Sequence, residues 1–185
     1  MDYNKEQKKI VEEVKKNCVS TKGGGKRDGD VCCGIIKSHI ENYIPLTKKV
    51  IGPHIFIKDI PNELDLIVIN KEAKPDDFVN SFNIDDVDLV LEIKKNGPRP
   101  AKKKPHPLGK TRIWFDKIKG KKSEVICCYL TISEQISKNP DSDYFVKSKN
   151  ELYPYNCFML CDTKINTNLN EGSWETFLKE LKLIR

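Results

Sequence analysis

The chain has 185 residues, of which 38% are hydrophobic and 32% are charged, and its formal net charge is +6. A chain of this length suits one domain with a substantial hydrophobic core. Its apolar stretches are far shorter than the roughly 20 residues that span a bilayer, and its first residues lack the apolar segment of a signal peptide, so we expect a cytoplasmic protein that does not enter a membrane.

Hydrophobic periodicity divides the chain into helices and strands. Four segments carry apolar residues at helical spacing: 3–18, 30–43, 108–119 and 174–184. Five segments show the alternation or the short apolar runs of strands: 50–57, 63–69, 87–94, 125–131 and 157–161. A flexible glycine-rich loop is expected at 22–29, followed by Asp30 as the N-cap of the second helix.

This order predicts an α/β fold of the mixed α+β kind, in which helices flank a central mixed sheet of about five strands. We expect a single domain over 1–185. It divides into an N-terminal helix and glycine-rich loop at 1–29, a core at 30–162 and a C-terminal helix at 163–185.

The seven cysteines are predicted to be small buried hydrophobes. They form no Cys-x-x-Cys pair, and no group of cysteine and histidine has the spacing of a zinc finger. Most of them lie inside apolar runs such as 125–130. We therefore interpret them as reduced thiols in the core of an intracellular protein.

The charges are distributed in two opposed blocks. Residues 59–92 hold ten acidic and two basic side chains, and residues 94–122 hold twelve basic and one acidic side chain. A basic block neutralises phosphates and releases their counterions. An acidic block beside it suits an enzyme that holds a cation near a polyanion, although a solvated lysine-rich loop would give the same composition.

Acidic side chains interrupt the two central apolar strands. Asp65 shares one face of the segment 63–69 with aliphatic residues, and Glu92 shares a face of the segment 87–94 with Lys94. Residues that face each other on antiparallel strands lie about 5 Å apart. If these strands pair in that way, Asp65 and Glu92 approach the same point and Lys94 stands beside Glu92.

Two carboxylates that converge in a half-buried place repel each other unless a cation lies between them. Mg²⁺ prefers oxygen ligands and commonly uses one or two carboxylates. A water on such an ion loses its proton more readily, and an ammonium beside it can stabilise developing charge. The pattern indicates metal-assisted hydrolysis of a phosphodiester. The alternative, three solvated side chains on an exposed sheet face, is less favoured because Glu-x-Lys ends an apolar strand and leads directly into the basic block.

The segments Pro61-Asn62-Glu63-Leu64-Asp65 and Glu92-Ile93-Lys94 resemble the motif of the PD-(D/E)xK nuclease superfamily, which has the restriction-endonuclease-like fold. The resemblance spans about residues 30–130. It implies that Asp65 and Glu92 bind the metal, that the carbonyl of Ile93 is a further ligand, and that Lys94 is the catalytic lysine. The cofactor implied is Mg²⁺, with Mn²⁺ able to replace it.

The superfamily often adds an acid from the helix before the first strand. This sequence has no single clear residue for that role. Asp30 and Glu41 are candidates on the second helix, and Glu12 or Glu13 are candidates on the first. Glu63 shares the face of Asp65 and is a candidate either as an alternative ligand or as a residue that contacts the ligands.

The basic residues after the third strand are predicted to contact the nucleic acid backbone, which positions a substrate without reading its bases. They are Lys95, Arg99, Lys102, Lys103, Lys104, Lys110 and Arg112.

The function expected is a Mg²⁺-dependent DNA endonuclease, most simply a type II restriction-like enzyme. It would act as a homodimer, because cutting both strands of a palindrome needs two sites related by two-fold symmetry, and a cognate methyltransferase would be its partner. The alternatives are a structure-specific or defence nuclease of the same superfamily, a non-catalytic nucleic-acid-binding module with this fold, and an interaction protein without a nucleic-acid role.

Overall fold

The computed structural model describes residues 2–18, 25–76, 80–96, 107–133, 150, 152–162 and 168–184. Its helices are α1 (Tyr3–Asn17), α2 (Gly25–Ile40), α3 (Pro107–Lys121), α5 (Ser173–Glu180) and the 3₁₀ turn η1 (Ile84–Asp86). Its strands are β1 (Lys48–Ile51), β2 (Ile55–Ile57), β3 (Ile60–Leu64), β4 (Leu66–Asn70), β5 (Ser81–Phe82), β6 (Val87–Asn96), β7 (Ile126–Ser133), β8 (Asn156–Asp162) and β9 (Asn168–Leu169). None of the described helices is long and apolar enough to cross a membrane.

The central sheet has the strand order β1-β4-β6-β7-β8-β9. The pairs β1·β4, β4·β6 and β8·β9 are antiparallel, and β6·β7 and β7·β8 are parallel. The expected mixed sheet of about five strands flanked by helices is therefore confirmed, with the two-residue strand β9 as an additional edge. The predicted antiparallel pairing of the two central strands is the pair β4·β6.

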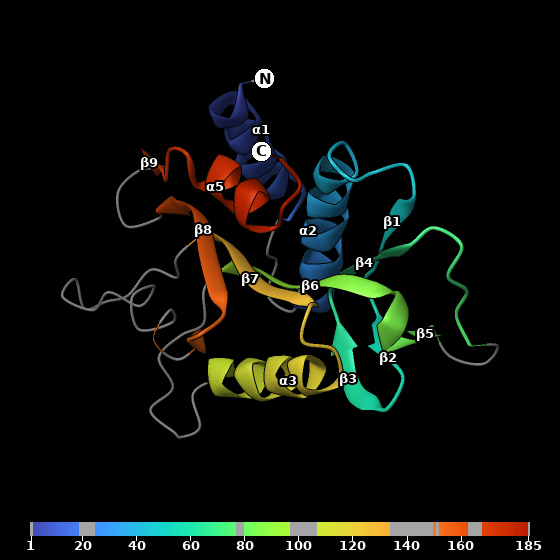
Figure 1. Cartoon of the computed structure of the whole chain (residues 1–185). Helices are drawn as coiled ribbons and strands as arrows, with labels where there is room; N and C mark the ends of the chain where they lie inside the picture. Colours follow the sequence, from blue (N-terminus) through green and yellow to red (C-terminus); the bar gives the residue numbers. More distant parts are fainter. Residues whose placement is uncertain are drawn as a thin grey trace.

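Helices cover both faces of this sheet (Figure 1). On one face, α1, α2 and α5 bury Ile10, Ile36 and Trp174 against the aliphatic side chains of β4 and β6. On the other face, Phe115 and Ile118 of α3 pack with Val90 and Tyr129. A smaller sheet of order β3-β2-β5 contributes to this second core. Because successive side chains of a strand point to opposite faces of the sheet, β4 and β6 each contribute apolar side chains to both cores.

The structure divides both strand segments expected near the start of the core. In the segment 50–57, β1 ends at Ile51 and β2 starts at Ile55. In the segment 63–69, β3 ends at Leu64 and β4 starts at Leu66. The strands before and after each break belong to different sheets. In one continuous strand over 63–69, Leu64 and Leu66 would share a face, but the break at Asp65 places them in opposite cores.

The second helix begins earlier than the sequence predicts. It starts at Gly25, so Asp30 lies inside the helix instead of capping it, and the loop expected at 22–29 is helical from Gly25. Tertiary contacts outweigh the low helix propensity of glycine here. Asp28 forms an ion pair with Lys95 of β6 at 2.9 Å, and its carbonyl accepts a hydrogen bond from the Cys18 thiol at 3.3 Å.

All seven cysteines are buried, as expected. Burial is the main reason that the pKa of Cys32 and of Cys127 is raised to about 12. These thiols are therefore protonated at neutral pH and behave as small apolar side chains.

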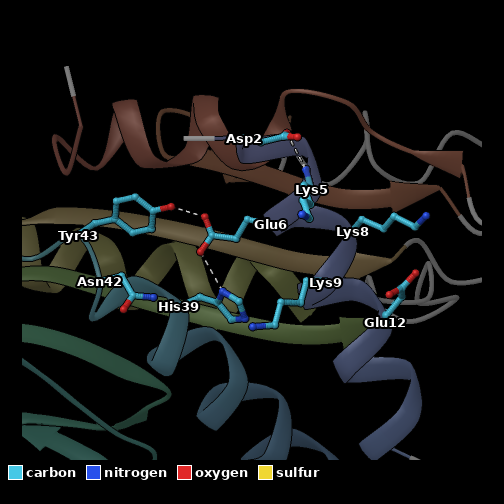
Figure 2. Close-up of a pocket in the computed structure, with 9 residues that line it drawn as sticks. All are labelled: Asp2, Lys5, Glu6, Lys8, Lys9, Glu12, His39, Asn42 and Tyr43. Atoms are coloured by element: carbon cyan, nitrogen blue, oxygen red, sulfur yellow. Dashed lines mark hydrogen bonds and ion pairs between the residues drawn. The ribbon is translucent and has the colours of Figure 1, made fainter.

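A carboxylate ties the N-terminal and C-terminal helices together. Glu6 of α1 accepts hydrogen bonds from Nδ1 of His39 at 2.9 Å, from Nε1 of Trp174 at 3.1 Å and from the Tyr43 hydroxyl. Glu6, His39 and Tyr43 lie at a pocket of about 900 Å³ beside α1 and the end of α2 (Figure 2). His39 is buried, and its contact with Glu6 fills a structural role in this network.

Replacing Glu6 with alanine should lower the free energy of unfolding by about 3 kcal/mol, because hydrogen bonds to a charged group contribute about 1.5–3 kcal/mol and the buried indole N–H would lose its partner. Urea-induced unfolding measures the change. The exposed Glu12 of the same helix is the matched control, and Glu12→Ala should change stability by less than about 0.5 kcal/mol. Equal effects of the two substitutions would contradict the role given to Glu6.

Candidate active site

Asp65 occupies the break between β3 and β4, where the chain passes from the small sheet to the central sheet. Gly52 makes this break possible. A Cβ atom on Gly52 would lie 2.1 Å from the Asp65 carbonyl oxygen and 2.5 Å from Cδ2 of Leu66, and its φ of +151° disfavours other residues. The close approach of these two backbones sets where the Asp65 carboxylate can point.

Glu92 and Lys94 lie two residues apart on β6, so their side chains leave the same face of the sheet. The Lys94 ammonium is 2.6 Å from Oε1 of Glu92 and 3.0 Å from Oδ2 of Asp65. The structure therefore brings together the three residues predicted from the motif. Their side chains are 10% exposed for Glu92, 25% for Asp65 and 45% for Lys94, so the carboxylates are the deeper groups and the ammonium is the more accessible one.

Burial and charge act against each other in this cluster. Burial raises the pKa of Glu92 above its ordinary value, the nearby Lys94 lowers it and the Asp65 charge raises it. Burial opposes the charge on Lys94, but Glu92 and Asp65 together raise its pKa above the ordinary lysine value. Lys94 is therefore a permanent cation at neutral pH, and it is what keeps two acids compatible in a small volume.

The backbone of β6 also faces Asp65. The N–H of Ile93 donates to Oδ2 of Asp65 at 2.7 Å, because β4 pairs with β6 only as far as Leu66 opposite Leu91. In an extended strand the N–H and the C=O of one residue point to the same side. The carbonyl of Ile93, predicted as a ligand, therefore lies on the same open edge as Asp65.

This donor set fits a hard divalent cation. Two carboxylate oxygens already converge on one positive charge, and Mg²⁺ commonly uses one or two carboxylates together with waters. Among the described residues, no group of three or more His, Cys, Asp or Glu side chains is arranged to hold a metal ion. Asp65, Glu92 and the Ile93 carbonyl offer two carboxylates and one carbonyl oxygen, and their role as metal ligands stays a prediction.

Two of the other candidate acids, Asp30 and Glu63, meet at a histidine that the sequence patterns do not mark. His54 places Nε2 at 3.1 Å from Oδ1 of Asp30, and its Nδ1 contacts Oε1 of Glu63. The hydrogen bond to Glu63, followed by that to Asp30, raises the pKa of His54. His54 follows Gly52-Pro53 in the segment expected to be one strand over 50–57, and no hydrophobic pattern in the sequence marks it.

The predicted nucleic-acid-binding residues have different surroundings. Lys110 and Arg112 are exposed on α3, where Arg112 lies 3.9 Å from Asp116. Lys95 is engaged within the protein by Asp28 and by the carbonyl of Cys18. Arg99, Lys102, Lys103 and Lys104 lie outside the described residues, so their role stays a prediction.

Three solved structures similar to this chain are all of NucC. The chain aligns with NucC of E. coli MS115-1 in a cAAA-bound form at a TM-score of 0.62 and 11% identity, covering 97% of this chain and 88% of that one. For NucC of P. aeruginosa ATCC27853 in a cAAA-bound form the TM-score is 0.59 at 11% identity, with 97% and 89% covered. For the apo form of the E. coli protein it is 0.50 at 12% identity, with 96% and 88% covered.

No family model matches the sequence, and no curated protein matches it. The likeness to NucC therefore concerns the fold. This fold matches the restriction-endonuclease-like core that the sequence leads us to expect.

Gly52→Ala should destabilise the protein by at least about 2 kcal/mol in urea-induced unfolding, because the added Cβ overlaps the Asp65 backbone in a conformation that favours glycine. Gly34→Ala on α2 is the matched control, since nothing lies within 4 Å of its Cβ position. That substitution should stabilise the protein by about 0.5–1 kcal/mol through helix propensity. A Gly52→Ala protein as stable as the wild type would refute the close approach.

Proposed function

We propose that the protein is a Mg²⁺-dependent endonuclease that hydrolyses phosphodiester bonds of DNA. One observation carries this proposal: the carboxylates of Asp65 and Glu92 both contact the single ammonium of Lys94 in a largely buried place. The restriction-endonuclease-like core supports it, and the resemblance of the segments around Asp65, Glu92 and Lys94 to the PD-(D/E)xK motif implies that these three residues form the site.

The metal would be held by Asp65, Glu92 and the carbonyl of Ile93. When bound, Mg²⁺ supplies Lewis-acid polarisation of a phosphate oxygen and a water of lowered pKa. The low exposure of Glu92 restricts its motion and limits competition from solvent, so the carboxylates are already in place before substrate arrives.

Lys94 has two roles in this proposal. In the free protein its ammonium neutralises part of the charge on the two acids. Because its side chain is 45% exposed, the same ammonium can reach a phosphate, where it stabilises negative charge that develops on oxygen during hydrolysis. Lys110 and Arg112 would position the DNA backbone, since both are exposed on α3 and bases of this kind contact phosphates without reading sequence.

The pattern of cutting would distinguish two classes of DNA endonuclease. A type II restriction-like enzyme would be a cytoplasmic homodimer that cuts a palindrome and is matched by a methyltransferase for the same site. A defence nuclease would cut without such a site. The cAAA-bound NucC structures add a testable form of this second class, in which cutting depends on the nucleotide.

Supercoiled and linear DNA incubated with the protein should be cut in Mg²⁺ and left intact in EDTA. Asp65→Asn, Glu92→Gln and Lys94→Ala should each lower kcat at least about 100-fold, the loss expected when a charge-stabilising group is removed from an active site. Asp88→Asn, at the other end of β6, is the control and should keep wild-type activity. Its carboxylate pairs with Lys48 at 2.5 Å, away from the site.

Each assay should be run with and without cAAA, and the ends of the products should be sequenced. A defined palindromic site would identify the restriction class, and cutting that appears only with cAAA would identify the nucleotide-dependent class. Absence of cutting on every DNA and RNA substrate under both conditions would reject the nuclease and favour a binding module.

A further inference from the structure

A bridge of three side chains joins three separate parts of the chain next to Asp65. Asp30 lies on α2, His54 lies between β1 and β2, and Glu63 lies on β3. One ring nitrogen of His54 is 3.1 Å from Asp30, and the other contacts Glu63. We refer to these three residues as the His54 bridge.

The chemistry of the ring determines its state. Carboxylates accept hydrogen bonds, so both ring nitrogens must donate, and only the imidazolium has two N–H donors. Asp30 and Glu63 are therefore each committed to His54. They are not two acids turned toward one shared ion, which agrees with the absence of any metal-binding group of three among the described side chains.

The bridge lies on the segments that position Asp65. Glu63 precedes Asp65 by two residues, and His54 follows Gly52 by two residues. Gly52 is the glycine whose backbone approaches the Asp65 carbonyl. The two segments therefore meet at two points: their backbones approach each other at Gly52, and their side chains are in contact through His54 and Glu63. Asp30 connects both segments to α2, and the same helix carries Cys33, whose pKa is raised by burial and then by the charge of Asp65.

The backbone of His54 has an unfavourable conformation, so the contacts of the His54 bridge must offset a cost in free energy. Its φ is +64°, a conformation that residues other than glycine adopt rarely. The carbonyl of His54 accepts a hydrogen bond from Nδ2 of Asn80 at 3.2 Å, which supports the same conformation. Strained residues of this kind persist where the surrounding contacts compensate for them, and they concentrate at functional sites.

We propose that His54 is a positioning residue of the active site: it holds Glu63 of β3 against Asp30 of α2 and thereby keeps the Asp65 carboxylate on the Ile93 N–H and beside Glu92. The inference rests on the function proposed above. It extends that function by giving Asp30 and Glu63 a role as anchors of His54 instead of metal ligands.

His54→Asn is the informative variant, because asparagine tolerates a positive φ but cannot bridge two carboxylates. Its stability in urea should equal that of the wild type. Its kcat for Mg²⁺-dependent DNA cleavage should fall roughly tenfold, since a misplacement of about 1 Å can cost up to roughly 100-fold, and KM should change less than about twofold. His54→Arg, which restores a cation with several donors, should recover most of the kcat.

Hydrogen exchange at the Ile93 amide measures the position of Asp65 without any catalysis, because that N–H donates to Oδ2 of Asp65. Exchange should be roughly tenfold faster in His54→Asn, in Asp30→Asn and in Glu63→Gln than in the wild type. Asp59→Asn is the control, since Asp59 also has a positive φ, of 62°, in the neighbouring turn between β2 and β3. It should change neither exchange nor kcat.

The outcomes separate this inference from the proposed function. If the protein cuts no nucleic acid but the Ile93 amide exchanges faster in the three bridge variants, the positioning role of His54 is supported and the nuclease function is rejected. If DNA is cut and His54→Asn matches the wild type in kcat and in exchange, the positioning role is rejected and the nuclease function is supported. If Asp30→Asn abolishes cutting and metal binding while His54→Asn keeps both, Asp30 is a metal ligand and the inference is wrong.

Discussion

Two carboxylates in a largely buried place require a positive charge between them, and this electrostatic constraint organises the centre of the molecule. The Lys94 ammonium meets it, at 2.6 Å from Glu92 and 3.0 Å from Asp65. A lysine can do this without losing its proton because the two acids raise its pKa by more than burial lowers it. In the proposed function the remaining negative charge would attract a divalent cation, since one ammonium balances only one of the two carboxylates.

The sheet creates the place where these charges meet. β6 pairs antiparallel with β4 on one side and parallel with β7 on the other. Since β4 begins only at Leu66, none of the described strands pairs with the last part of β6 on the β4 side of the central sheet. A strand edge with free backbone groups is a binding surface, and the Asp65 carboxylate uses it by accepting the Ile93 N–H. The fold thus leaves open the part of β6 that carries Glu92 and Lys94.

Much of this arrangement could be predicted from the sequence, because the two central strands have strong alternation and carry their charged residues near their ends. The alternation is compatible with antiparallel pairing without requiring it, and the meeting of Asp65, Glu92 and Lys94 follows once the strands pair in that way. The break at Asp65 could not be predicted in the same way. No glycine or proline interrupts the segment 63–69, whereas the change of sheet depends on Gly52, which approaches Asp65 from an earlier segment of the chain.

Local signals failed where distant contacts decide the structure. Glycines at 23–25 and 29 indicated a loop, but the contacts of Asp28 with Lys95 and Cys18 extend the helix back to Gly25. His54 belongs to no periodic hydrophobic pattern in the sequence. Its role can be recognised only when the fold places Asp30 of α2 and Glu63 of β3 around it. Asp30 and Glu63 were recognised as acids near the site, and their shared partner was missed for the same reason.

The most direct test of the central claim is a calorimetric titration of Mn²⁺ into the wild type, Asp65→Asn and Glu92→Gln. Carboxylate ligands must be deprotonated to bind metal, and burial raises the pKa of Glu92, so affinity should weaken as the pH falls through the pKa of Glu92. We expect one saturable site in the wild type and at least roughly tenfold weaker binding in each variant. Equal affinity in all three proteins would contradict the account.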